Sequence, residues 1–170
     1  MKFFLISFFV SCLFNHKAFS LDTIAKQAIL YDYETKTIIF EKNSEELMSP
    51  SSMSKIMTIY YVFKKIKDGD LKLTDKFKVS KKAWKKGGSK MFVNVNTMVS
   101  VEDLIRGIIV QSGNDACIAI AEGISGSEAL FAEELNLLAQ EIGMMNSSFT
   151  NSTGWPDPDH LTTIKDLLTL

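Results

Sequence analysis

A serine and a lysine that could perform nucleophilic chemistry lie close together at the start of a predicted helix. Lys55 follows Ser51 by four positions and Ser52 by three, and either spacing places both side chains on one helix face, one turn apart. A serine hydroxyl becomes an effective nucleophile when a nearby base takes its proton. Lysine can be that base only if its pKa falls from about 10.4 toward neutrality, through desolvation or a neighbouring cation. Helical spacing alone leaves Ser51 and Ser52 open, and a serine N-cap followed by a surface lysine fits the same residues.

The helix that must position these residues is predicted to begin just after Pro50. Proline disfavours helical conformation in the residue before it, and serine is a favourable N-cap. The apolar residues that follow recur on one face with a helical period; they are Met53, Ile56, Met57, Tyr60 and Phe63, widened by Tyr61 and Val62. We therefore expect a helix that lies deep in the core, presents this face to it, and ends near Gly69.

The remaining elements are predicted from local patterns. Two strands over 27–33 and 37–41, joined by a polar turn, form a hairpin, and a short strand follows at 77–80. Helices are expected from Ser100 to about residue 111, over 115–122 and over 127–142, and a last one begins at Thr163 with a capping box. Residues 123–126 are expected to form a turn. The lysine-rich segment 81–86 is either a solvated loop or a rim that attracts an anionic substrate.

A second group of polar residues, Ser112-Gly113-Asn114, occupies the predicted break between two helices. Such a break projects a hydroxyl and an amide from a rigid base. The hydroxyl can relay a proton between a lysine and a leaving amine, and the amide can fix a peptide carbonyl. The same residues also fit an ordinary helix end followed by an asparagine N-cap.

Composition and charge indicate one exported globular domain. The 170 residues are 46% hydrophobic and 23% charged, which is ordinary for a folded domain. Residues 1–20 combine a positive start, a largely apolar run over 3–14 and a small-x-small ending, as secretory signal peptides do. Removing them leaves 17 basic and 20 acidic residues and a net charge of −3, so nothing indicates nucleic-acid binding. We expect a signal peptide over 1–20, one domain over 21–170, and a location in the periplasm or cell envelope.

The few cysteines and histidines narrow the chemistry further. After residue 20 the chain has one cysteine, Cys117, which is expected to be a small core residue without a disulfide partner, and one histidine, His160. A histidine-based zinc site needs more ligands than this, so we expect no metal and no cofactor. The sequence has no Gly-x-Ser-x-Gly elbow and no phosphate-binding loop. A serine enzyme here is therefore expected to use a lysine base rather than His160.

Taken together, these motifs resemble those of the penicillin-recognising serine DD-peptidases. Ser52-x-x-Lys55 is followed about sixty residues later by Ser112-x-Asn114, as in the low-molecular-mass D-alanyl-D-alanine carboxypeptidases. The likeness covers nearly all of residues 26–170 and includes the stretches 28–32, 50–61, 88–92, 104–107, 111–116 and 149–154. It implies an α/β (α+β) fold of the β-lactamase/transpeptidase type, with a helical subdomain and the N-terminal strands of an antiparallel sheet.

The resemblance also implies a role for each site residue. Ser52 attacks the carbonyl between two D-alanines and forms an acyl-enzyme, with Lys55 as its base and its own backbone N–H in the oxyanion hole. Ser112 relays the proton to the departing D-alanine, and Asn114 binds the amide of the substrate or of a β-lactam. The implied partners are peptidoglycan stem peptides as substrate and β-lactam antibiotics as inhibitors.

One family motif is missing from this sequence. The family carries Lys-Thr-Gly or Lys-Ser-Gly on a late strand, whereas Lys36-Thr37 is followed by Ile38 and precedes the nucleophile. We therefore expect residues 21–170 to be a truncated, impaired catalytic domain that lacks the late strands, with membrane-surface attachment possible but not encoded here. The alternatives are a non-catalytic envelope protein that binds peptidoglycan or a partner, and a class A-like β-lactamase. Class A β-lactamases usually have an aspartate where this chain has Gly113.

Overall fold

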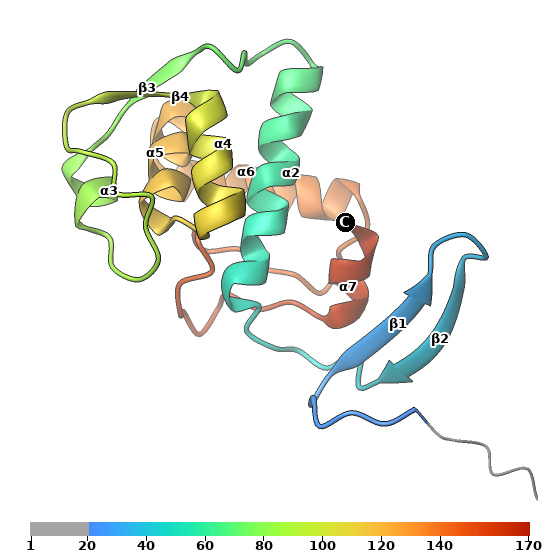
Figure 1. The fold of residues 1–170 in the computed structure, drawn as a ribbon. Helices are drawn as coiled ribbons and strands as arrows, with labels where there is room; N and C mark the ends of the chain where they lie inside the picture. The colour runs from blue at the N-terminus through green and yellow to red at the C-terminus, as the bar shows by residue number, and fades with distance from the viewer. Residues whose placement is uncertain (1–20) are drawn as a thin grey trace, which may run out of the picture.

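The computed structural model describes residues 21–170 (Figure 1). The signal-peptide prediction concerns residues 1–20, which lie outside the described residues. The elements, in chain order, are β1 Ala28–Asp32, β2 Thr37–Lys42, a 3-10 turn Ser51–Met53, α2 Ser54–Lys67, β3 Lys76–Lys78, α3 Lys81–Lys85, β4 Met98–Ser100, α4 Val101–Gln111, α5 Asn114–Ser125, α6 Glu128–Glu141 and α7 Ile164–Thr169.

The predicted N-terminal hairpin is confirmed. Strands β1 and β2 pair antiparallel, from Ala28 opposite Lys42 to Asp32 opposite Thr37, with a bulge at Leu30 and Tyr31. The Asp32 carboxylate closes the turn, because its Oδ1 accepts hydrogen bonds from the backbone N–H groups of the two residues that follow Tyr33. The hairpin lies to one side of the helices, next to α7 (Figure 1). A second short antiparallel pair, β3 and β4, joins the predicted strand near residue 77 to one that the sequence did not indicate.

Helix α5 forms the centre of the helical part. Residues 116–121 are all fully buried, including Cys117 as predicted. One apolar cluster joins α5 to α2, α3 and α4, and a second joins α2 to α6 and the segment around Phe149. Helix α5 continues to Ser125 and ends at Gly126, which has φ +80°. The prediction of a turn over 123–126 is therefore wrong for its first three residues, because the helix extends one turn further before the left-handed glycine stops it.

Three of the predicted helix starts have side-chain caps. The hydroxyl oxygens of Ser100, Ser127 and Thr163 each accept a hydrogen bond from the backbone N–H three residues later, at 3.0–3.2 Å. These caps satisfy donors that have no partner within the helix. Local sequence thus determines where α4, α6 and α7 begin.

The predicted buried face of α2 is only partly confirmed. Met57, Tyr61 and Val62 are buried as predicted, but Met53, Ile56, Tyr60 and Phe63 are 41, 52, 39 and 47% exposed. The other buried side chains of the helix are Ser54, Lys55, Thr58 and Ile59. This face packs against α4 and α6, with the Tyr61 ring edge-on to Phe131 at 5.3 Å. The buried polar members are compensated by hydrogen bonds to a distant loop, described below.

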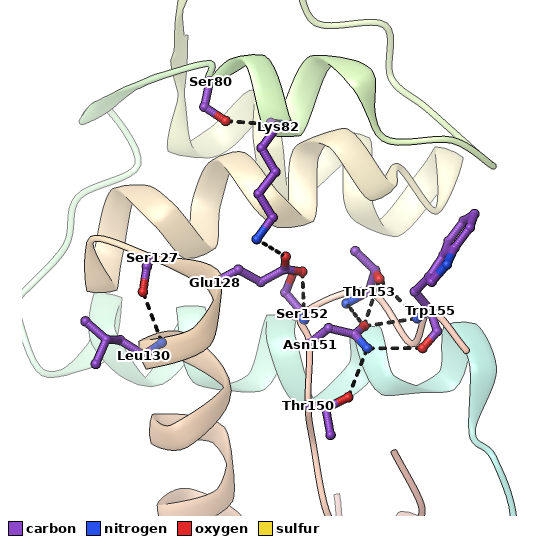
Figure 2. A network of polar contacts seen from close by, with 11 residues as sticks. Ser80, Lys82, Ser127, Glu128, Leu130, Thr150, Asn151, Ser152, Thr153 and Trp155 are labelled. Atoms are coloured by element: carbon purple, nitrogen blue, oxygen red, sulfur yellow. Dashed lines mark hydrogen bonds and ion pairs between the residues drawn. The ribbon is translucent and has the colours of Figure 1, made fainter. Parts of the chain in front are cut away.

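The lysine-rich segment is a helix rather than the loop that one interpretation predicted. Lys81–Lys85 form α3, which begins where the Ser80 hydroxyl accepts from Ala83 N–H at 3.0 Å (Figure 2). Ala83 is fully buried in the larger apolar cluster, so the short helix is anchored by one small side chain. None of the helices within residues 21–170 is both long and apolar enough to cross a lipid bilayer.

Candidate active site

The 3-10 turn before α2 holds the candidate nucleophile in an exposed position. Ser51 adopts a left-handed backbone conformation with φ +49°, which is uncommon for a residue other than glycine. The backbone N–H of Met53 donates to the Pro50 carbonyl at 3.0 Å, and the Ser54 hydroxyl donates to the Ser51 carbonyl at 2.9 Å. Neither Ser51 nor Ser52 caps α2 with its side chain. The N-cap interpretation of these serines is therefore not what the geometry shows.

Lys55 is buried and directed at Ser52. Its ammonium lies 3.2 Å from the Ser52 Oγ and donates to the Thr153 carbonyl at 2.7 Å, while the side chain is only 6% exposed. Desolvation lowers the pKa of Lys55, with the nearby Cys117 thiol acting in the opposite direction. Both effects that a lysine base requires, contact with the hydroxyl and a reduced proton affinity, are present. The geometry favours Ser52 over Ser51, which helical spacing alone had left open.

Three of the four predicted site residues surround one cavity. A cavity of about 310 Å³ is lined by Ser52, Lys55, Ser112 and four isoleucines, Ile56, Ile59, Ile108 and Ile109. Ser112 ends α4 in a left-handed conformation with φ +53°, which turns the chain sharply into α5. The sequence prediction that this break projects a hydroxyl from a rigid base agrees with its position.

Asn114, the fourth predicted residue, is held on the other side of this break by the 86–93 loop. Its side-chain amide donates to the Gly87 carbonyl at 2.9 Å, and its backbone N–H donates to the Ser89 carbonyl at 2.8 Å. The residue is 7% exposed and does not line the cavity in the described structure. A Cβ placed on Gly88 would lie 2.7 Å from Asn114 Nδ2, so the glycine allows the loop to approach this side chain.

Asp115 is a positioning residue that the sequence analysis missed. The carboxylate is 1% exposed and accepts hydrogen bonds from the backbone N–H groups of Met91, Phe92 and Val93 at 2.9, 2.9 and 3.2 Å, and from Ala116 N–H at 3.0 Å. Phe92 has φ +63°, so this carboxylate stabilises a strained turn. The sequence analysis interpreted Asp115 only as the start of a helix. Its position next to Asn114 was the one feature of the sequence that could have indicated its role.

The 150–155 loop supplies the carbonyl that orients Lys55, and Asn151 organises that loop (Figure 2). The Asn151 Oδ1 accepts from the backbone N–H groups of Thr153 and Trp155 and from the Thr153 hydroxyl, at 2.8–3.1 Å. Its Nδ2 donates to Thr150 Oγ1 and to the Trp155 carbonyl. Both ends of the Asn151 amide thus bind other residues of this loop.

Glu128 attaches the same loop to α3. Its carboxylate accepts from the Ser152 backbone N–H at 3.2 Å and hydroxyl at 2.9 Å, and pairs with Lys82 at 2.7 Å (Figure 2). Burial acts to raise the pKa of Glu128, but the hydrogen bonds from Lys82 and Ser152 outweigh this effect and the pKa is lowered. The Ser152 carbonyl in turn accepts from the Thr58 hydroxyl of α2 at 2.8 Å.

His160 connects this loop to the nucleophile turn. Thr150 N–H donates to its Nδ1 at 3.1 Å, so the proton of the neutral ring lies on Nε2, which donates to the Ser54 hydroxyl at 2.8 Å. Burial lowers the pKa of His160, with Asp157 opposing, and favours this neutral form. His160 thus takes no part in a Ser-His-Asp arrangement with Ser52. Within residues 21–170, no group of three or more His, Cys, Asp or Glu side chains could hold a metal ion.

One protein family matches nearly the whole of this chain. The family model described as D-alanyl-D-alanine carboxypeptidase matches residues 15–170. The chain belongs to the D-alanyl-D-alanine carboxypeptidase family. It is 38% identical over 143 residues to the D-alanyl-D-alanine carboxypeptidase DacF of Bacillus subtilis, covering 84% of this chain and 37% of DacF. It is 39% identical over 152 residues to DacC of Escherichia coli, covering 86% and 38% of the two chains.

Solved structures of the family have the same fold. The D-alanyl-D-alanine carboxypeptidase DacD of Francisella tularensis matches with a TM-score of 0.85 and 40% identity, over 88% of this chain and 36% of that one. Penicillin binding protein 5 of Haemophilus influenzae matches with a TM-score of 0.84 and 37% identity, over 88% and 44%. The predicted family and α+β fold class are confirmed. The chain spans less than half the length of these relatives, so the activity of the whole family protein is treated below as a proposal.

Proposed function

We propose that Ser52 of this chain is the nucleophile of a serine-type D-alanyl-D-alanine carboxypeptidase that trims peptidoglycan stem peptides in the cell envelope. The observation that carries the proposal is the buried Lys55 ammonium, 3.2 Å from Ser52 Oγ and with a lowered pKa. The names of the relatives supply the substrate class and the penicillins as inhibitors. The proposed export of the chain through residues 1–20 rests on the sequence pattern alone.

The proposed reaction begins with proton transfer from the Ser52 hydroxyl to the neutral amine of Lys55. The Ser52 oxygen attacks the carbonyl carbon between the two D-alanines, and the bond to the terminal D-alanine nitrogen then breaks. Ser112 passes the proton to that leaving amine, which departs as free D-alanine, and the rest of the peptide stays as an ester on Ser52. Water then hydrolyses the ester and returns the serine hydroxyl.

Three groups bind or orient rather than react in this proposal: the Ser52 backbone N–H, the Asn114 amide and the Thr153 carbonyl. The Ser52 backbone N–H provides one donor to the oxyanion. The Asn114 amide donates to Gly87 in the absence of substrate, and its oxygen and second N–H hydrogen are available for the substrate amide. Thr153 orients the amine of Lys55 through its carbonyl, so the 150–155 loop contributes geometry to the proton transfer.

A fluorescent penicillin tests the proposal. The chain should form a covalent adduct that mass spectrometry assigns to Ser52, and the adduct should be absent in Ser52→Ala and retained in the neighbouring Ser51→Ala. Release of D-alanine from an acetylated peptide ending in D-Ala-D-Ala should follow the same pattern. A well-folded chain that takes no label supports a non-catalytic binding protein instead, and rapid turnover of the penicillin supports a β-lactamase.

A further inference from the structure

The ammonium of Lys86 lies over an aromatic ring. It is 4.0 Å from the centroid of the Trp155 ring, a distance at which the ring face attracts a cation. Among residues 21–170, no carboxylate lies within ion-pair distance of Lys86, whereas its neighbour Lys82 is paired with Glu128. Partial burial lowers the pKa of Lys86, with Glu128 acting in the opposite direction and Lys82 adding to the effect.

Trp155 is fixed in place although its indole is 42% exposed. Its backbone N–H and carbonyl are both bound by Asn151, at 3.0 and 3.1 Å, and the indole projects away from that amide (Figure 2). The ring lies against the 86–93 loop: a Cβ on Gly87 would be 3.7 Å from it and a Cβ on Gly88 3.3 Å. An exposed aromatic ring whose backbone is held this firmly offers binding area at a low entropic cost.

The pair is close to Asn114, a residue of the proposed reaction. A Cβ on Gly88 would lie 2.7 Å from Asn114 Nδ2 and 3.3 Å from the Trp155 ring, and the Gly87 carbonyl accepts from the Asn114 amide. The surroundings are cationic, because residues 81–97 contain five lysines and no acidic residue. Within the 81–86 run, Lys86 is the lysine that is partly buried, whereas Lys81, Lys82 and Lys85 are exposed.

From this arrangement we infer that Lys86, held by Trp155, is a specificity-determining residue that binds a carboxylate carried by the peptide substrate outside the scissile bond. The inference rests on the proposed function, because it names a feature of the same substrate. The indole occupies one side of the ammonium and leaves its remaining N–H donors for an anion. An ammonium that is partly removed from water attracts a carboxylate more strongly than an exposed lysine such as Lys85 does.

The test uses two peptides that differ by one charge, acetyl-Glu-D-Ala-D-Ala and acetyl-Gln-D-Ala-D-Ala. Binding is measured by isothermal titration calorimetry in the Ser52→Ala variant, a readout that does not depend on Trp155. The glutamate peptide should bind about two- to five-fold more tightly, the range of one partly exposed ion pair. The preference should disappear in Lys86→Met, weaken in Trp155→Leu, and persist in Lys85→Met, which removes an equal charge from the adjacent position.

Each result decides between this inference and the proposed function. Equal binding of the two peptides, or a preference that survives Lys86→Met, overturns the role of Lys86 even if the wild-type chain releases D-alanine. A carboxylate preference that depends on Lys86, in a chain that releases no D-alanine, supports the binding role and overturns the hydrolytic one. Binding of neither peptide overturns both.

Discussion

The backbone of Gly154 lies directly against the carbonyl group of Ser51. A Cβ added to Gly154 would be 1.6 Å from the Ser51 oxygen, and Gly154 has φ +75°. The loop that orients the base and the turn that carries the nucleophile are therefore in backbone contact. This contact requires a residue without a side chain.

Gly154→Ala is expected to destabilise the protein by about 2–4 kcal/mol, since the left-handed conformation and the overlap with Ser51 both oppose it. Gly126→Ala is the matched control, because Gly126 has φ +80° but nothing within 4 Å of an added Cβ. The control should lose about 1 kcal/mol from strain alone. Urea unfolding of the two variants measures the difference, and equal losses would contradict a tight contact.

Lys55→Arg is expected to slow acylation by a penicillin by about 10²–10⁴-fold, because a guanidinium cannot be deprotonated and so cannot serve as the base. The wild-type rate should rise with pH as Lys55 loses its proton. The midpoint of this rise should lie below pH 10.5, because desolvation lowers the pKa of Lys55. Lys67→Arg, at the far end of the same helix, should leave the rate unchanged. Acylation of Lys55→Arg at the wild-type rate argues against Lys55 as the base.

Asp115→Asn is expected to destabilise the protein by about 2–3 kcal/mol. Both carboxylate oxygens accept hydrogen bonds from backbone N–H groups, and in asparagine one of these oxygens is replaced by an NH₂ group that cannot accept. The strained turn at Phe92 should open as a result, and limited proteolysis should cut the variant within the 86–93 loop. Asp103→Asn, an exposed residue in the first turn of α4, should cost less than about 1 kcal/mol. Similar stability and similar resistance to protease in the two variants would be inconsistent with this role for Asp115.

His160 is expected to make the protein less stable as the pH falls below 6.5. Burial holds the pKa of His160 below its ordinary 6.5 in the folded chain, so the unfolded chain takes up the proton first. The stability is fully present above pH 6.5 and is lost as the pH falls through the folded-state pKa, by at most about 1.4 kcal/mol per pH unit. Urea unfolding between pH 8 and pH 5 should show this extra slope relative to His160→Gln. Parallel curves for the two proteins would mean that His160 does not titrate on unfolding.

The sequence predicts best the features that depend on neighbouring residues. The caps at Ser100, Ser127 and Thr163 are recognisable because donor and acceptor are three residues apart. The hairpin of β1 and β2 is recognisable for the same reason, since its turn follows immediately from the strands. The spacing of Ser52 and Lys55 likewise survives in the structure as a direct contact.

The buried face of α2 could be predicted only in part because the helix has apolar residues on two sides. Ile56 and Phe63 belong to one side, and Ile59 and Val62 belong to the other. Only the second side also carries Lys55, whose burial is compensated by a carbonyl from a remote segment. Periodicity counts such a lysine against burial, so the predicted face included the exposed Ile56 and left out the buried Ile59.

The groups that orient the site were missed for a related reason. The Thr153 oxygen that binds Lys55 is a main-chain atom, and a carbonyl has no residue type that a pattern can detect. Asp115 binds backbone N–H groups that are more than twenty residues away in the sequence. His160 binds a serine that is 106 residues away. Their partners become apparent only when the chain has folded.

The amine of Lys55 and the carbonyl that directs it are separated by 98 residues. At ribosomal rates of about 5–20 residues per second, the acceptor is made roughly 5–20 seconds after the amine. A nascent chain that ends before Thr153 contains both the serine and the lysine but lacks the contact that aims one at the other. Biosynthesis thus places a delay between the appearance of the reactive groups and the moment at which they can react.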